Sequence, residues 1–247
     1  MDDFGWVLGA LGLVVGGILK GATGAGAPIV AVPLLAIAYN VPLAVAVFTA
    51  PSLLANAWQG WRYRSHQGSP LFLWLFAGAG GAGAVLGSFL LVTLDSKTLF
   101  AVISVLVFAY IAFRLLRPHW QLPETIAVRL AGPVGFVGGV LQGAAGVSAP
   151  ASLTFLNAMG LTRERFIAVV SVFFWVMSAV QLVALTWLGV MTWTYAALSL
   201  AACVPLFVAM PIGAALARRV SRQVFDRIVL ALLGVVAVRL LLEAIPL

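Results

Sequence analysis

Apolar residues gather in long blocks along the chain, separated by short polar connections. In the first half, apolar segments run at about 5–20, 27–39, 42–62, 70–93 and 97–116. After a polar stretch at 117–129, five more follow at about 130–142, 149–160, 164–188, 193–217 and 223–244. Apolar runs of about 20 residues are typical of transmembrane helices. The pattern predicts an all-α polytopic membrane protein with no polar block long enough to form a soluble domain.

The two halves of the chain resemble each other. Gly16–Pro28 reads GGILKGATGAGAP and Gly138–Pro150 reads GGVLQGAAGVSAP, so eight of thirteen positions are identical at an offset of 122. Polar residues further along keep the same offset, since Asn56 corresponds to Ser178 and Gln59 to Gln181. An internal repeat of this kind predicts two structural units. We expect an N-terminal transmembrane repeat at 1–117, a cytoplasmic linker at 118–129 and a C-terminal repeat at 130–247.

Arginines indicate how the segments are oriented, because they favour the cytoplasmic side. They gather at four connections: Arg62 and Arg64; Arg114, Arg117 and Arg129; Arg163 and Arg165; Arg218, Arg219 and Arg222. All four lie in the cytoplasm only if the first two segments of each half return to the side on which they began. Either a hairpin or two tilted crossings meets this condition. The second of these segments, with about 12 residues, is marginal for crossing about 30 Å at about 1.5 Å per residue, which favours the hairpin. We therefore expect each half to contain a broken or re-entrant short helix pair plus three transmembrane helices. The repeats then have inverted topology, with both termini outside.

Composition and charge support the membrane assignment. Hydrophobic residues make up 63% of the 247, charged residues only 9%, and the mean hydropathy is +1.13. The net charge of +7 comes from basic residues at segment ends, which is the pattern of topology signals and excludes a nucleic-acid-binding surface. The single cysteine, Cys203, cannot form an internal disulfide. The first residues, MDDFGW, are acidic where a cleavable signal would be basic, so we expect the first segment to remain.

The glycine-rich breaks at the start of each half are the strongest candidates for a binding site. Glycine tolerates backbone conformations that other residues resist and leaves N–H groups uncovered, and Pro28 is suited to begin a helix. Non-helical backbone at membrane depth survives only in protein or beside a polar cavity. We expect unpaired N–H groups and the positive end of a helix dipole there, which together favour an anion. Close helix packing is the alternative for any single glycine.

Polar side chains near the breaks extend the candidate site. Lys20 is costly at membrane depth, so it marks a pathway or snorkels from a helix end, and its counterpart is the neutral Gln142. A polar stripe of Thr49, Ser52, Asn56 and Gln59 lies on one helical face; it lines a cavity or bonds neighbouring helices. The residues expected to bind substrate are Lys20, Gly21, Ala22, Thr23, Gly24, Ala25, Gly26, Ser52, Asn56, Gln59, Gln142, Gly143, Ala144, Gly146, Val147, Ser148, Ser178 and Gln181.

Catalysis and cofactor binding find no support in the sequence. His66 and His119 lie in connections without a cysteine or carboxylate at metal-ligand spacing. No acid lies clearly at mid-membrane, so neither a carboxylate proton relay nor a carboxylate-ligated sodium site is visible, and no nucleotide motif occurs. We expect no enzyme activity, no cofactor and no metal. Energy then has to come from an ion or substrate gradient, with protons or sodium as candidate coupling ions, and a homodimer is a candidate assembly.

The breaks also carry a family resemblance. GATGAGAPIVAVPLL (Gly21–Leu35), followed by AVFTAPSLLAN, resembles the signature of the sulfite exporter TauE/SafE family, and GAAGVSAP with SVFFWVMSAVQ is similar to that family's C-terminal half. The chain departs from a symmetric pattern where Ser148 corresponds to Gly26 and Phe155 to Pro33. The resemblance implies a multi-pass permease of the inner membrane that moves sulfite, sulfoacetate or another organosulfonate by alternating access. The alternatives are an anion channel of the same architecture and a permease for a different small organic anion.

Overall fold

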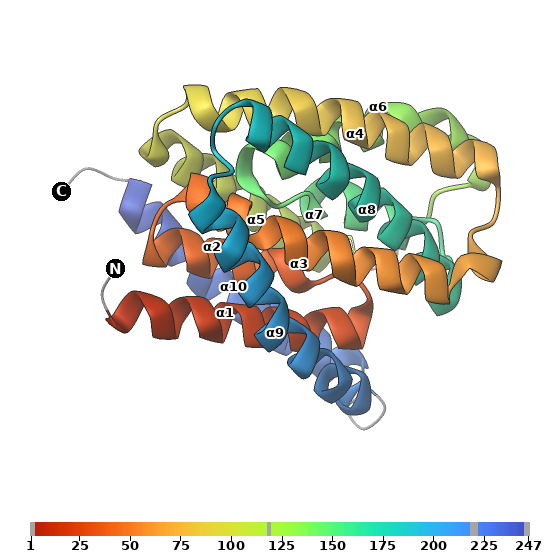
Figure 1. Ribbon diagram of the computed structural model, residues 1–247. Coiled ribbons are helices and arrows are strands. Elements are labelled where there is room, and N and C mark those ends of the chain that lie inside the picture. Colours follow the sequence, from red (N-terminus) through yellow and green to blue (C-terminus); the bar gives the residue numbers. More distant parts are fainter. Residues whose placement is uncertain (1–2, 118–119, 218–221, 245–247) are drawn as a thin grey trace.

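The computed structural model describes residues 3–117, 120–217 and 222–244. This part of the chain is all helical, and Figure 1 shows the helices packed in one bundle. In order they are α1 (Asp3–Thr23), α2 (Ala27–Ala38), α3 (Val41–Arg62), the short 3₁₀ segment η1 (Arg64–His66), α4 (Pro70–Thr93), α5 (Ser96–Leu116), α6 (Glu124–Ala145), α7 (Ala149–Ala158), α8 (Arg163–Trp187), α9 (Trp193–Leu216) and α10 (Arg222–Ala244). Asp2, His119, Arg218 and Arg219 lie outside the described residues.

All ten predicted segments correspond to helices, which confirms the all-α polytopic fold. In the described part of the chain, seven helices are long and apolar enough to cross a membrane: α1, α3, α4, α5, α6, α8 and α9. The protein is therefore a multi-pass membrane protein. Its five helices before residue 117 are matched by five after residue 123.

The helix pair that opens each half differs from the predicted one. Only its second member is short, because α2 has 12 residues and α7 has 10, whereas α1 has 21 and α6 has 22. The sixth predicted segment was placed too late, since α6 begins at Glu124 and already contains Arg129. Polarity misled the sequence analysis there, because Glu124 and Arg129 are exposed side chains on the first turns of a helix.

Side-chain caps explain where most of the long helices begin. The residue before each of five helices accepts a hydrogen bond from the backbone N–H three positions later, which satisfies a donor that the first turn leaves unpaired. At α5 the cap is an exposed carboxylate, and hydrogen bonds from the backbone and side chain of Thr98 hold its pKa below the usual value. The five capping residues are Asn40, Ser69, Asp95, Thr162 and Thr192.

Two pairs of parallel helices, each joining the two halves of the chain, frame the bundle. Helix α6 packs on α4 so closely that a Cβ atom at Gly139 would lie 2.0 Å from the carbonyl oxygen of Gly80. Helix α1 packs on α9 in the same way, with a Cβ atom at Gly21 falling 1.9 Å from the Met210 carbonyl oxygen. Both pairs need glycine because backbone meets backbone. Between them, α3 and α8 cross antiparallel at the centre of the bundle.

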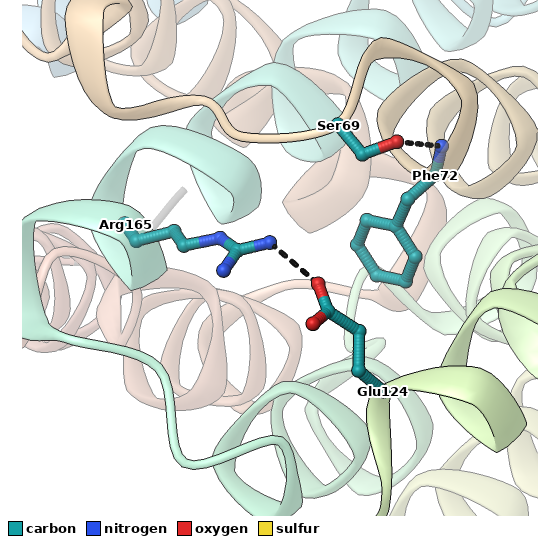
Figure 2. A network of polar contacts seen from close by, with 4 residues as sticks. All are labelled: Ser69, Phe72, Glu124 and Arg165. Carbon is teal, nitrogen blue, oxygen red and sulfur yellow. Dashed lines mark hydrogen bonds and ion pairs between the residues drawn. The ribbon is translucent and has the colours of Figure 1, made fainter.

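The connections that carry arginines meet at one end of the bundle. Arg165, at the start of α8, donates to the Glu124 carboxylate at the start of α6 over 3.1 Å. Figure 2 shows this pair beside the start of α4, where the Ser69 hydroxyl accepts from the N–H of Phe72. Connections 62–70, 116–124 and 158–163 therefore lie on the same side of the membrane-spanning helices. The predicted clustering of arginines at these connections agrees with this arrangement.

Candidate anion-binding site

Each half of the chain contains one break, and the two have the same backbone geometry. The first break, 24–26, separates α1 from α2; the second, 146–148, separates α6 from α7. Gly24 and Gly146 adopt left-handed conformations, with φ of +84° and +68°. Each also donates its N–H over 2.8 Å to the carbonyl oxygen four residues earlier, on Lys20 or Gln142. The repeat predicted from the sequence therefore extends to the backbone of both breaks.

Both left-handed glycines press against the opposite half of the molecule. A Cβ atom at Gly24 would lie 2.6 Å from Cγ1 of Ile167 on α8. At Gly146 it would lie 2.7 Å from Cγ1 of Val32 and 3.2 Å from Cγ2 of Val45 on α3. Val45 and Ile167 are themselves equivalent at the offset of 122. Backbone conformation and close contact thus both require glycine at these two positions.

Lys20 is buried beside the first break. Its side chain is 2% exposed, and its ammonium nitrogen donates to the Gly24 carbonyl oxygen over 2.8 Å and to Oδ1 of Asn56. The nitrogen also lies 6.0 Å from the ring centroid of Phe174. Burying an ammonium without partners is very costly, and these acceptors reduce that cost. The side chain therefore does not snorkel to the surface but points into the protein.

The polar stripe of α3 meets the equivalent residues of α8. The Ser178 hydroxyl donates to the Ser52 hydroxyl over 2.8 Å, and Ser171 donates to Oε1 of Gln59 over 3.4 Å. Gln181 turns toward the second break, where its Nε2 donates to the carbonyl oxygens of Gln142 and Gly143, each over 3.3 Å. The polar stripe therefore has two roles: it bonds the central helices to each other, and it lines the cavities beside the breaks.

Two cavities lie at the centre of the bundle, one at each break. The first cavity is lined by Val32, Val45, Phe48, Thr49, Ser52, Gln142, Gly146, Ser178 and Gln181. The second cavity has a volume of about 10 Å³ and is lined by Lys20, Ala25, Ala27, Pro28, Phe48, Pro51, Ser52, Ala55, Asn56, Phe174 and Leu206. Phe48 and Ser52 line both cavities. All of these residues are buried.

The prediction of unpaired N–H groups is wrong for all three residues of the first break, since Gly24 already donates to the Lys20 carbonyl oxygen. Thr23 folds back over the break, and its hydroxyl oxygen accepts from the N–H groups of Ala25 and Gly26 over 3.2 and 3.1 Å. The start of α2 still faces the second cavity through Ala27 and Pro28, and Gly26 provides no side-chain cap there. In the second break, Ser148 shares a hydrogen bond with Ser152 over 3.0 Å instead of lining the first cavity.

The structure brings about half of the candidate residues to the cavities. Ten candidates line neither cavity, for reasons of packing: Gly21 and Gly143, for example, contact backbone of α9 and α4. Phe48 and Leu206 were not predicted, because apolar residues that line a cavity cannot be distinguished in the sequence from other buried residues. The candidates that line a cavity are Lys20, Ala25, Ser52, Asn56, Gln142, Gly146, Ser178 and Gln181. The others are Gly21, Ala22, Thr23, Gly24, Gly26, Gln59, Gly143, Ala144, Val147 and Ser148.

Comparison with known proteins agrees with this architecture. The model of one protein family, described as "Sulfite exporter TauE/SafE", matches residues 8–240 and so includes both breaks and both central helices. No curated protein and no solved structure matches the chain significantly. The family match covers nearly the whole length of the chain. It therefore extends the resemblance from the two breaks to the helices that surround the cavities. The chain therefore belongs to the sulfite exporter TauE/SafE family.

Proposed function

We propose that the protein is a secondary transporter that moves a small sulfur-containing anion, such as sulfite, sulfoacetate or another organosulfonate, by alternating access. The observation that carries this proposal is the ammonium group of Lys20, which is buried at a helix break and lines a cavity. Membership of a transporter family supports the general activity. The positive potential in the second cavity supports a negatively charged substrate.

The second cavity combines two sources of positive potential. Lys20 is the one charged side chain that is buried among the described residues whose burial is known. The start of α2, at Ala27 and Pro28, contributes the positive end of a helix dipole. An anion between them would replace the solvation that the ammonium lost on burial.

Alternating access is supported by the closure of both cavities and by the contacts between the halves. Every lining residue is buried, so substrate must reach the cavities through a movement of helices. The breaks touch equivalent positions, Gly24 against Ile167 and Gly146 against Val45, and α3 crosses α8 antiparallel. These contacts favour two inverted repeats built around central sites, which is a common design in secondary transporters.

Transport assays in liposomes test the proposal. The wild-type protein should show saturable exchange or uptake of radiolabelled sulfite, and Lys20→Gln should reduce it at least tenfold because the charge that recognises the anion is lost. The chain has one other lysine, the exposed Lys97, so Lys97→Gln is a matched control that should retain transport.

Three results would count against the proposal in different ways. Undiminished transport by Lys20→Gln would show that Lys20 does not contribute to the substrate-binding site. Flux that rises linearly with sulfite concentration would favour an anion channel. Transport of small carboxylates in preference to sulfite and sulfonates would reassign the substrate to another class of organic anion.

A further inference from the structure

Lys20 and Gln142 occupy equivalent positions in the two repeats but differ in charge. Beside the second cavity, Nζ of Lys20 binds the carbonyl oxygen of Gly24 and Oδ1 of Asn56. The equivalent residues beside the first cavity are Gly146 and Ser178, and both line it together with Gln142. The second repeat therefore keeps oxygen atoms around Gln142 but lacks the ammonium group that binds the corresponding oxygen atoms in the first repeat.

Gln142 has an unsatisfied acceptor in this surrounding. The residue is 3% exposed, and its side-chain oxygen Oε1 has no hydrogen-bond partner among the described residues. A buried polar atom without a partner costs about 1–3 kcal/mol, so its presence requires an explanation. A bound ligand that interacts with an oxygen lone pair would provide one.

The other polar groups of the first cavity have mostly used their donors. The Thr49 hydroxyl donates to the Val45 carbonyl oxygen over 2.8 Å, and the Ser178 hydroxyl donates to Ser52 over 2.8 Å. Nε2 of Gln181 is bonded to backbone carbonyl oxygens. Oxygen lone pairs therefore remain on Thr49 and Ser178, whereas the Ser52 hydroxyl oxygen already accepts from Ser178 and from Nδ2 of Asn56. The cavity also adjoins the carboxyl end of α6, which carries the negative end of a helix dipole. This surrounding suits a cation and disfavours an anion.

We propose that the first cavity binds a monovalent cation, with Na⁺ as the ion to test, through Gln142 and the hydroxyl oxygens of Thr49 and Ser178. A divalent ion would require carboxylate ligands, and none lines the cavity. No cluster of His, Cys, Asp and Glu side chains able to hold a metal occurs in the described ranges either. Lys20 supplies in the first repeat the positive charge that a bound ion supplies in the second.

The proposed ion and the substrate would lie in neighbouring cavities. Ser52 and Phe48 line both, so opposite charges in the two cavities would attract each other through protein of low dielectric constant. This part of the inference rests on the proposed function. Fully ionised sulfite carries two negative charges, and Lys20 together with one monovalent cation would neutralise them. Binding of either partner should then strengthen binding of the other by the same factor.

Thermal unfolding of the purified protein in detergent tests the cation site without a transport assay. NaCl, compared with choline chloride at equal concentration, should raise the Tm of the wild type in a saturable manner, because a ligand that binds only the native state stabilises it. Gln142→Ala should lose this Na⁺-dependent shift. Gln142→Lys should also lose it while matching or exceeding the wild-type Tm in choline chloride, because the new ammonium group takes the place of the ion.

Thr154→Val is a matched control, since Thr154 has a buried hydroxyl oxygen without a partner but does not line the first cavity. It should keep the Na⁺-dependent shift. A wild type that responds equally to sodium and choline, or a Gln142→Lys protein that keeps the shift, would overturn the cation site. If Gln142→Ala does not fold, Gln142→Lys decides the question alone. Sulfite transport without a sodium response would leave the proposed function intact, and a sodium response without sulfite transport would leave only the cation site.

Discussion

At the scale of single residues, the buried ammonium group of Lys20 is stabilised by each of its hydrogen-bond acceptors. The ammonium group is buried and binds one backbone carbonyl oxygen and one side-chain amide oxygen. Asn56 is held for this role by its own hydrogen bond, from Nδ2 to the Ser52 carbonyl oxygen over 2.7 Å. Its amide oxygen is thereby directed toward the ammonium. The pair links α1 to α3 across the second cavity.

Asn56→Leu should therefore destabilise the protein by about 1.5–3 kcal/mol, the usual contribution of a hydrogen bond to a charged group. Equilibrium unfolding in mixed detergent micelles would measure the change. The same substitution in a Lys20→Met background should cost clearly less, because the buried charge is no longer present. Equal costs in the two backgrounds would show that Asn56 matters for packing and not for the ammonium.

The two residues were both predicted as candidates from the sequence, but their contact was not. Lys20 stood out as a charge in an apolar segment, and Asn56 as a member of a polar stripe. The hydrogen bonds of Thr23 to the first break were missed because nothing in the sequence distinguishes a threonine that faces a ligand from one that caps its own loop. Side-chain direction depends on the backbone around Gly24, which composition does not specify.

At the scale of helices, the close approach of α4 and α6 is the most demanding contact. Glycines face backbone atoms from both sides: a Cβ atom at Gly83 would lie 2.1 Å from the Phe136 carbonyl oxygen, and one at Gly135 would lie 2.3 Å from that of Phe76. Without a hydrophobic driving force between helices in lipid, such packing supplies much of the association energy. Close packing, which was expected as the alternative role for glycines of the breaks, is thus the role of Gly83 and Gly135.

A single added methyl group tests this contact. Gly139→Ala should destabilise the protein by about 1–3 kcal/mol or more, because two backbones must separate to admit it. Gly78→Ala, on the same pair but with nothing within 4 Å of its Cβ position, should be neutral or stabilising by up to about 1 kcal/mol. Unfolding in mixed micelles and the yield of monodisperse protein would measure both.

Similar losses in the two glycine variants would contradict the close approach. Helix positions themselves were predicted well from the apolar runs, because long apolar runs separated by short polar connections leave few alternatives. Which helices pack against each other was not predicted. Several helices contain glycines, and only the assembled bundle shows that α6 pairs with α4 and α1 with α9.

At the scale of the whole molecule, the orientation expected from the arginines can be measured. Ser65 follows α3 and Ser96 begins α5, so the two exposed serines lie at opposite ends of α4. In a Cys203→Ala background, Ser96→Cys should react with a membrane-impermeant maleimide on intact cells. Ser65→Cys should react only after permeabilisation, because its connection carries Arg62 and Arg64 and is expected in the cytoplasm.

The reverse labelling pattern would invert the proposed topology. The two serines form a matched pair, since each substitution exchanges one oxygen for one sulfur at an exposed position of a connection.

The general plan of two similar halves could be predicted from the sequence, because thirteen aligned positions at each break carry the signal. The division of the centre into two cavities could not, since it depends on the apolar side chain of Phe48 between them.

The closure of both cavities has a consequence for the cell that makes this protein. Because every residue that lines the two cavities is buried, neither cavity provides an aqueous route for protons or small ions in this conformation. Copies at rest in the bilayer would therefore leave the membrane potential and the pH gradient undisturbed. The cell could hold the protein in reserve at high abundance without losing the energy of its ion gradients to leakage.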